Sequence, residues 1–131
     1  PVKIAIGCFI FAAGTLLLAG AGFVTDSAGK TPLLLAVIFH FVSNLGWLFT
    51  VPSLNTLFSR LAPRSVNATM LGVNATSVTF GSFISGRLGG LYETLSPLQF
   101  WTLHAAIVGV GGVLMLLIGL WLKRMVAPPA G

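Results

Sequence analysis

The chain has 131 residues, of which 56% are hydrophobic and only 7% are charged, and its formal net charge is +5. Soluble domains carry about 25% charged residues, so this composition excludes an ordinary water-soluble fold and indicates a membrane protein. The basic residues stand at separated positions and form no patch, which excludes a nucleic-acid partner.

Charged residues are so rare that they divide the chain into long uncharged runs, which cover 4–25, 31–59, 65–86 and 94–122. Crossing the hydrocarbon core of a bilayer as a helix takes about 20 residues, and every run is long enough. We therefore predict an all-α membrane protein with four transmembrane helices, near 4–24, 33–58, 66–91 and 97–124.

The segments between the runs have the composition of turns. They read "TDSAGKTP", "SRLAPRS" and "YETLSP" in chain order. Pro32 suits the opening turn of the second helix, and Ser96 is a candidate N-cap for the fourth helix. Because the last two connections are short, we expect neighbouring helices to pack antiparallel.

Basic residues predict the direction of the helices. One side of the four-span arrangement carries Lys3, Arg60, Arg64, Lys123 and Arg124, and the other side carries Asp26, Lys30 and Glu93. An excess of Lys and Arg marks the cytoplasmic face. We therefore predict a multi-pass protein of the plasma membrane or the bacterial inner membrane, with both termini in the cytoplasm. Arg87 is the exception, and we interpret it as a side chain that reaches the outer interface.

The second predicted helix carries polar side chains in the middle of its apolar run. One face, formed by steps of three and four residues, contains His40, Asn44, Trp47, Val51 and Leu54, flanked by Ser43 and Thr50. The third helix has a second polar stripe, which contains Asn67, Asn74, Ser77 and Gly81. Polar groups in the hydrocarbon layer are costly unless they face protein or water. Two interpretations stay open: hydrogen bonding between packed helices, or the lining of a shared aqueous cavity.

Two residues of the second helix predict a bend. Pro52 removes one backbone hydrogen bond and its ring pushes against the carbonyl four residues earlier. Gly46 lies on the same helix, and the pair forms a candidate hinge or gating element.

Small residues recur at steps of three and four on the last two helices. They are Ser82, Gly86 and Gly90 on the third helix, and Ala105, Gly109 and Gly112 on the fourth. Because little hydrophobic force acts between helices in lipid, small residues that allow close approach supply the packing. We therefore expect both faces to contact other helices closely.

Enzyme chemistry finds no support in the sequence. His40 and His104 are the only imidazoles, they lie on different helices, and no cluster of carboxylates or thiolates accompanies them. A zinc site needs three or four protein ligands. We expect a protein that is not an enzyme and has no cofactor and no metal site.

Several segments follow one another in a characteristic order. They are "PVKIAIG", "LGWLFTVPSLNTLFSRLAP", "NATMLG", "FGSFISGRLGG" and "FWTLHAAIVGVGGVLMLLIGLWLKRM". This succession resembles the last four helices of the proton-dependent oligopeptide transporters, within the major facilitator superfamily. The resemblance covers nearly the whole chain, and it implies that residues 1–131 form the C-terminal part of a twelve-helix fold. The first residue is Pro rather than Met, as we expect for a piece of a longer protein.

The resemblance also implies a function. Such a transporter moves peptides or related small molecules by alternating access, as a symporter coupled to protons. The second and third helices would line the central cavity and form part of its cytoplasmic gate, with Asn44, Trp47, Asn74 and Ser77 as substrate-binding residues. The implied partners are a small-molecule substrate, the remaining helices of the same transporter and the lipid bilayer.

Two positions depart from the family pattern. Members usually carry Glu after the Gly in Gly-Glu-Leu of this second helix, where it meets the amino group of the peptide, and here Trp47 stands in its place. Members also tend to carry Trp two residues after Met-x-Gly, and here that residue is Asn74. No acid remains inside any uncharged run, so proton coupling must come from the missing N-terminal helices. We expect a ligand without a free amino group, or one whose amine is held elsewhere.

Two other classes of membrane protein are alternatives. A small four-helix membrane subunit with a structural or assembly role fits a free-standing chain of this length. A small four-span multidrug exporter fits the span count, but such exporters rely on a membrane-embedded Glu in their first helix, and residues 4–25 contain no acid.

Overall fold

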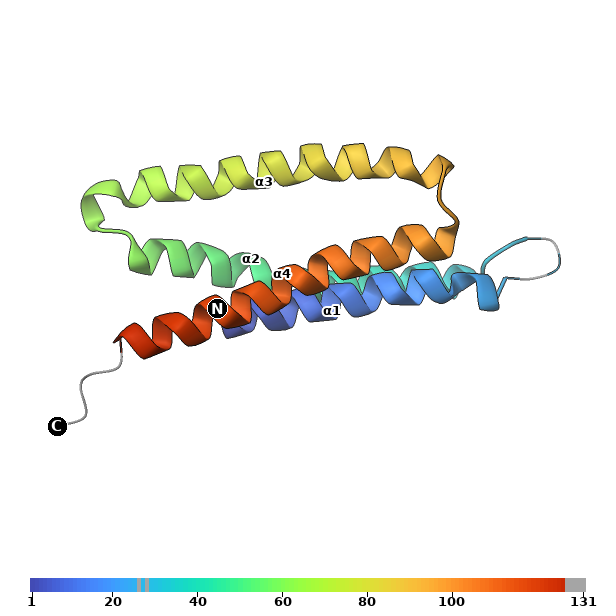
Figure 1. Cartoon of the computed structure of the whole chain (residues 1–131), viewed down its shortest axis with the longest axis horizontal. Helices are drawn as coiled ribbons and strands as arrows, with labels where there is room; N and C mark the ends of the chain where they lie inside the picture. Colours follow the sequence, from blue (N-terminus) through green and yellow to red (C-terminus); the bar gives the residue numbers. More distant parts are fainter. Residues whose placement is uncertain (26, 28, 127–131) are drawn as a thin grey trace.

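The computed structural model describes residues 1–25, 27 and 29–126, and this part of the chain contains helices and turns but no strand. Its elements are α1 (Val2–Ala19), η1 (Gly20–Phe23), α2 (Leu33–Leu61), η2 (Arg64–Val66), α3 (Asn67–Gly89), η3 (Gly90–Glu93) and α4 (Pro97–Val126), where η denotes a short 3₁₀-helix. The four long helices lie where the uncharged runs predict them, with ends that differ by a few residues (Figure 1). The predicted all-α fold class is therefore confirmed.

Local sequence explains where the helices begin and end. Ser96 caps α4 reciprocally with Gln99, because the Gln99 amide donates to Ser96 Oγ at 3.3 Å and the Ser96 amide donates to Gln99 Oε1 at 3.1 Å. This capping box confirms Ser96 as the N-cap. α2 ends at Leu61 because Ala62 precedes Pro63 and adopts the extended backbone, with ψ at 134°, that a following proline favours.

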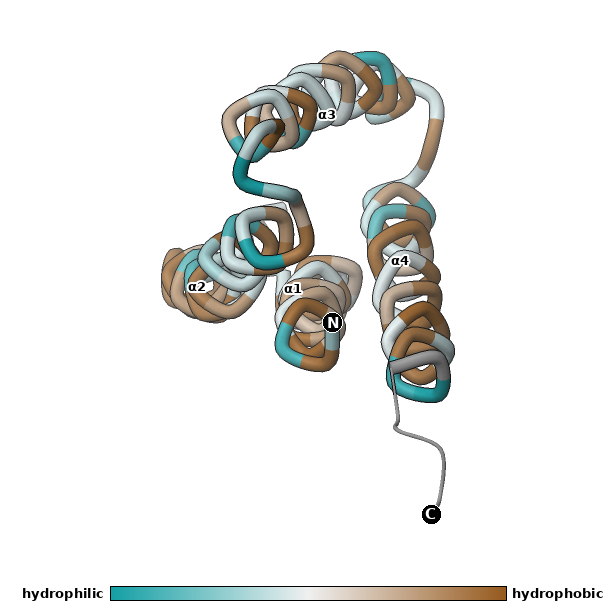
Figure 2. Tube along the Cα trace, turned by 90° about the vertical axis from the view of Figure 1, so that its left-hand side faces the viewer, coloured by the Kyte–Doolittle hydropathy of each residue, from teal (hydrophilic) through white to brown (hydrophobic). Residues whose placement is uncertain are grey.

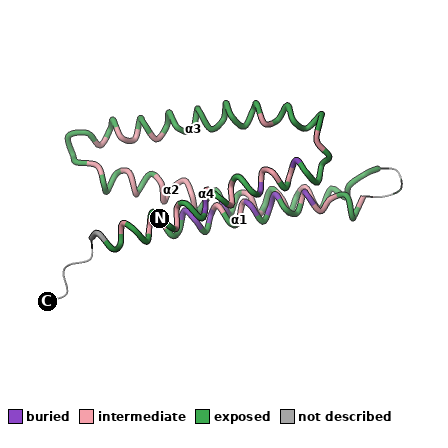
Figure 3. The backbone as a smooth tube through the Cα atoms, viewed as in Figure 1, coloured by how far each residue is buried: buried purple, intermediate pink, exposed green. Residues whose placement is uncertain are grey.

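α1 is the central helix of a three-helix unit, and it packs along both α2 and α4. Figure 3 shows that the buried positions concentrate on α1 and on parts of α4. The buried residues of α1 are mostly small: Ile4, Ala5, Gly7, Ala12, Gly14, Thr15 and Ala19. Small side chains let neighbouring helices approach closely, which is how helices associate when lipid removes the hydrophobic force between them.

The predicted small-residue faces behave differently on α4 and α3. On α4, a Cβ built at Gly112 would lie 3.1 Å from Cys8 Cβ and 3.1 Å from the ring of Phe9, so α1 and α4 meet closely there. A Cβ at Gly86 of α3, or at Gly90 where η3 begins, would meet no atom within 4 Å. The expected close contact is thus present at Gly112, whereas a Cβ at Gly109 of α4 would meet no atom within 4 Å, as at Gly86 and Gly90.

α3 also differs from the other helices in hydropathy. The helices that are long and apolar enough to cross a membrane are Val2–Phe23, Leu33–Leu61 and Pro97–Arg124. α3 intersperses its apolar residues with Asn, Thr and Ser, and Figure 2 shows it as a mixture of brown, white and teal. Three of the four predicted transmembrane helices are therefore supported, and the assignment of α3 as a membrane span stays a prediction. No residue of α3 is buried.

The four long helices alternate in direction, so their charged ends gather in two groups (Figure 1). One end of the molecule carries Lys3, Arg60, Arg64, Lys123 and Arg124. The other end carries Lys30 and Glu93, while Asp26 lies outside the described residues. The predicted separation of charge is therefore present in the fold, and the side of the membrane on which each end lies stays a prediction.

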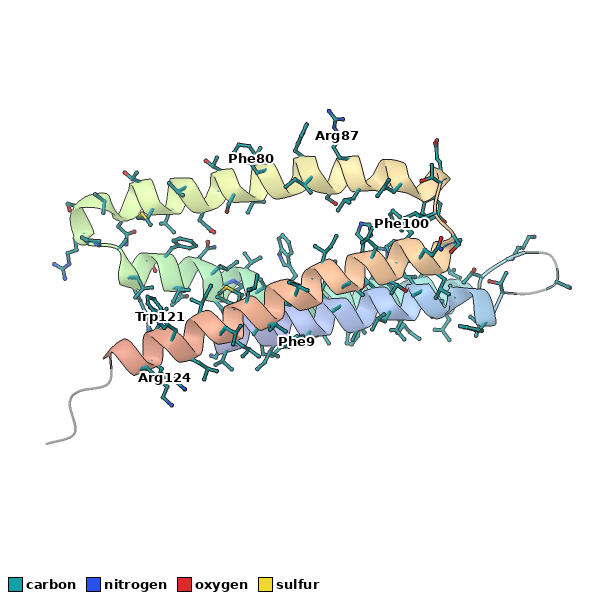
Figure 4. The ribbon with its side chains drawn as sticks, in the orientation of Figure 1. Phe9, Phe80, Arg87, Phe100, Trp121 and Arg124 are labelled. Atoms are coloured by element: carbon teal, nitrogen blue, oxygen red, sulfur yellow. The ribbon has the colours of Figure 1, made fainter. Side chains whose placement is uncertain are left out.

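Arg87 lies toward the second end and points away from the other helices, as does Phe80 (Figure 4). Its guanidinium carbon stands 5.3 Å from the centre of the Phe83 ring on the same helix. This cation–π contact keeps the charged group on the outer face of α3.

Candidate functional site

A groove of about 450 Å³ separates α2 from α3. Its lining residues come from one face of each helix, namely Trp47, Val51 and Asn55 on α2, and Leu71, Asn74, Ala75 and Val78 on α3. Steps of three and four residues place side chains on a common helical face, which explains why these seven meet. The volume falls within the roughly 300–1,000 Å³ of small-molecule sites.

Two amide side chains bridge the groove. Asn74 Nδ2 donates a hydrogen bond to Asn55 Oδ1 at 3.0 Å. Each amide has a second group left over, since Asn55 retains its own NH₂ and Asn74 retains its carbonyl oxygen. The groove therefore offers both a neutral donor and a neutral acceptor to a ligand.

Trp47 forms a flat wall beside these amides. Its side chain is 59% exposed, and its Nε1–H donates to no described residue. The described residues that line the groove include no ionisable side chain. A ligand in this groove would meet neutral hydrogen-bonding groups and an aromatic face, and no carboxylate to pair with an amine.

The groove contains two of the four predicted substrate-binding residues, Trp47 and Asn74. Asn44 lies outside it, and its Nδ2 donates to the His40 carbonyl oxygen of its own helix at 2.7 Å. Ser77 also bonds within its own helix, where its Oγ donates to the Asn74 carbonyl oxygen at 2.7 Å. The structure thus brings Trp47 and Asn74 together and leaves Asn44 and Ser77 beside the groove.

Asn55 lines the groove although the predicted polar stripe does not include it. It lies four residues after Val51 and eight after Trp47, so it continues the same helical face. The predicted stripe was continued to Leu54 instead, because a step of three after Val51 is equally helical. A polar residue one position further along an apolar helix was the signal that could have identified it.

A second face of α2 packs against α1. A Cβ at Gly46 would lie 2.8 Å from the Gly7 carbonyl oxygen and 3.1 Å from the Phe11 amide nitrogen. In the other direction, a Cβ at Gly7 would lie 2.6 Å from the Gly46 carbonyl oxygen and would overlap Thr50 Oγ1. The two backbones cross in direct contact here, so Gly46 is a packing point between helices, and its role as a hinge stays a prediction.

α2 remains helical across Pro52. The proline has no N–H, so the carbonyl of Leu48 lacks the donor that an interior helical residue would supply. Thr50 Oγ1 donates to the Gly46 carbonyl oxygen at 2.9 Å, and Thr56 Oγ1 donates to the Pro52 carbonyl oxygen at 2.7 Å. Side-chain hydrogen bonds therefore support the backbone on both sides of the position where one is missing. The bend predicted here stays a prediction.

The histidines belong to an aromatic cluster between α2 and α4. His104 Nδ1 lies 2.9 Å from the Phe100 carbonyl oxygen, and its ring centre lies 4.3 Å from that of Phe100. The His40 ring packs beside Phe39, which in turn reaches Trp101 at 6.0 Å between ring centres. Among the described residues no group of His, Cys, Asp and Glu could hold a metal ion. The Phe39–Trp101 contact links α2 to α4 within this cluster.

Comparison with known proteins gives one distant relative. The chain is 27% identical over 141 residues to "Dipeptide and tripeptide permease B" of Shigella dysenteriae serotype 1 (strain Sd197). The match covers 98% of the chain but 29% of the permease, so the chain spans less than a third of that relative's length. No protein-family profile and no solved structure matches the chain. The resemblance seen in the sequence is thus supported as a distant likeness to a stretch of a peptide permease.

Proposed function

We propose that the chain is part of a secondary transporter for peptides or related small amide-containing molecules, in which the groove between α2 and α3 is a section of the substrate path. One observation carries the proposal: a groove of small-molecule size that is neutral, amide-lined and walled by Trp47, on helices that pack beside apolar, membrane-length neighbours. The likeness to a dipeptide and tripeptide permease supports it.

The chemistry of the groove suits the middle of a peptide rather than its ends. A peptide group has one N–H donor and one C=O acceptor, and the free groups of Asn55 and Asn74 complement both. Trp47 offers an apolar surface for a substrate side chain. Because the groove has no ionisable side chain, it would not select for a free amino terminus, and the coupling proton would be handled by the remaining helices of the transporter.

Alternating access requires part of the wall to move while another part stays in place. The crossing of α1 and α2 at Gly46 would be the fixed point. Beyond it, the half of α2 that follows Pro52 would swing and would change the distance between Asn55 and Asn74. The basic end would lie in the cytoplasm, so this moving half would form part of the cytoplasmic gate.

The substrate class is tested by uptake of free and amino-blocked dipeptides into liposomes that contain the full-length protein. We expect the two to enter at rates within about threefold of each other, because the groove has no carboxylate to pair with the amine, and its neutral amides can bond a blocked amine as well as a free one. If a carboxylate in this groove bound the amine instead, the uptake rate of the amino-blocked dipeptide should be about tenfold or more below that of the free dipeptide.

The matched control variant is Trp47→Glu, which places a carboxylate in the same wall. It should shift preference toward the free amine by about tenfold. If the full-length protein takes up neither dipeptide, the transport function is contradicted. If the unaltered protein depends strongly on the free amine, the role of Trp47 is contradicted.

The hinge is tested with Pro52→Ala. Restoring the N–H lets Leu48 accept a helical hydrogen bond worth about 0.5–1.5 kcal/mol, so the swing of the second half of α2 should slow and substrate exchange should fall about fivefold. Exchange of labelled against unlabelled substrate across proteoliposomes measures this step. Pro32→Ala, which alters the proline just before α2, should leave the rate unchanged. An unchanged exchange rate in Pro52→Ala removes the hinge.

A further inference from the structure

The basic end of the molecule contains a pocket between the start of α1 and the last turns of α2. Its volume is about 410 Å³, and its lining residues are Pro1, Lys3, Ser53, Thr56, Leu57, Arg60 and Leu61. Two cationic side chains from different helices therefore share one pocket with two hydroxyl groups. No part of the proposed substrate groove is included in it.

Three of the four polar side chains that line this pocket have no partner among the described residues. Neither Lys3 nor Arg60 forms an ion pair with a described residue, and Ser53 Oγ makes no hydrogen bond to one. Thr56 Oγ1 donates its proton to the Pro52 carbonyl oxygen at 2.7 Å. The pocket thus presents N–H and O–H donors and positive charge, which is the complement of an oxyanion.

An apolar pocket of about 280 Å³ adjoins the first one. The two share Pro1, Leu57 and Leu61, and α4 adds Gly119, Leu122 and Lys123 to the second. A ligand that spanned both would place a charged group between Lys3 and Arg60 and a hydrocarbon portion against the leucines. Inorganic phosphate would use only the first pocket.

We propose that this end binds an anionic phospholipid, with its phosphate in the pocket of Lys3, Ser53 and Arg60 and the upper part of an acyl chain against Leu57, Leu61 and Leu122. Charge complementarity and the paired apolar pocket argue for this occupant. α1, α2 and α4 are long enough to cross a bilayer, which puts their ends at headgroup level. Basic pockets between membrane helices are the sites where anionic headgroups bind. The bound lipid would tie the end of α2 to the start of α1.

The test is native mass spectrometry of the delipidated full-length protein in detergent, with phosphatidylglycerol and phosphatidylcholine of identical chains. The first lipid should bind about tenfold more tightly. The double variant Lys3→Gln/Arg60→Gln should lower its affinity by about tenfold or more, because each change removes a charge-assisted hydrogen bond to the phosphate. The matched variant Arg64→Gln/Arg124→Gln removes the same charge from the same end without touching either pocket, and it should change affinity by less than about threefold.

A conservative variant guards against loss of folding. Arg60→Lys keeps the charge, so it should bind the anionic lipid within about threefold of the unaltered protein. Equal losses in both double variants, or no loss in either, would overturn the proposal in favour of general attraction or of no site.

Inorganic phosphate separates the two possible sources of the oxyanion. Millimolar phosphate should leave phosphatidylglycerol bound, because it cannot fill the apolar pocket. Leu57→Asn should weaken lipid binding and leave the folded protein intact on size-exclusion chromatography. Full displacement of the lipid by phosphate would assign the pocket to a free anion and would overturn the lipid as its occupant.

Discussion

Replacing Gly46 with alanine is expected to destabilise the folded protein by about 1–3 kcal/mol, the usual cost of inserting a methyl group into a site that is already packed. The new Cβ would lie 2.8 Å from the Gly7 carbonyl oxygen and 3.1 Å from the Phe11 amide nitrogen. Both are backbone atoms, so no side-chain rotation can relieve the contact and α1 must move away from α2. Because α1 also packs on α4, the displacement reaches the whole three-helix unit.

The measurement is the thermal unfolding midpoint of the full-length protein in detergent. Gly111→Ala is the matched control, since a Cβ at Gly111 would meet no atom within 4 Å. Alanine is about 1 kcal/mol more favourable than glycine inside a helix, so this variant should keep or raise the midpoint. Gly7→Ala should repeat the loss seen at Gly46. Equal midpoints for Gly46→Ala and Gly111→Ala would show that the two helices do not cross at this glycine.

The crossing of α1 and α2 at Gly46 could not be predicted from the sequence, whereas the helices that cross there could. The helices themselves follow from uncharged runs, and their ends follow from local rules such as the Ser96 capping box and the Ala62-Pro63 step. Such features depend on residues a few positions apart. The grouping of charges at two ends follows as well, since it needs only short connections and alternating direction.

Contacts between helices could not be derived in the same way. Helical periodicity assigns residues to a face, but it does not say which helix covers that face. Gly46 and Trp47 are adjacent in the sequence and serve different neighbours, because a step of one residue turns about 100° around the helix axis. Gly46 meets α1 and Trp47 faces α3. Thr50, a flanking member of the predicted polar stripe, likewise lies against Gly7 of α1, so the stripe combined residues that the fold separates.

α3 is a case in which a face with the spacing of a helix contact is not covered by any helix of the described chain. Its small-residue stripe has the spacing of a helix–helix contact, yet no described residue covers Gly86 or Gly90. Its lack of charged residues predicts a transmembrane helix, but its Asn, Thr and Ser residues make it more polar than the three apolar helices. A helix that mixes polar with apolar residues, and that the described part of this chain leaves exposed, fits the proposed surface along a substrate path, where the remaining helices would face it.

Replacing Asn74 with leucine is expected to reduce transport efficiency, kcat/KM for a dipeptide, about tenfold. Leucine keeps the approximate shape of the side chain and removes its amide, so a substrate peptide group loses one hydrogen-bonding partner, which costs about 1–3 kcal/mol when the group stays desolvated. The variant also leaves Asn55 Oδ1 without the donor that it has at 3.0 Å. Initial rates of labelled dipeptide uptake into proteoliposomes, over a range of substrate concentrations, measure the effect.

Asn44→Leu is the matched control, because Asn44 lies on the same helix as Trp47 but bonds to its own backbone outside the groove. We expect it to change kcat/KM by less than about twofold, since no substrate hydrogen bond is lost. The comparison also decides between the two interpretations of the polar stripes. If the amides only join helices, Asn74→Leu should cost about 0.6 kcal/mol of stability, the average for a hydrogen bond between membrane helices, and leave kcat/KM unchanged. If they meet the substrate, the loss in transport should exceed what that small loss of stability can explain, and Asn55→Leu should reproduce it from the opposite wall of the groove.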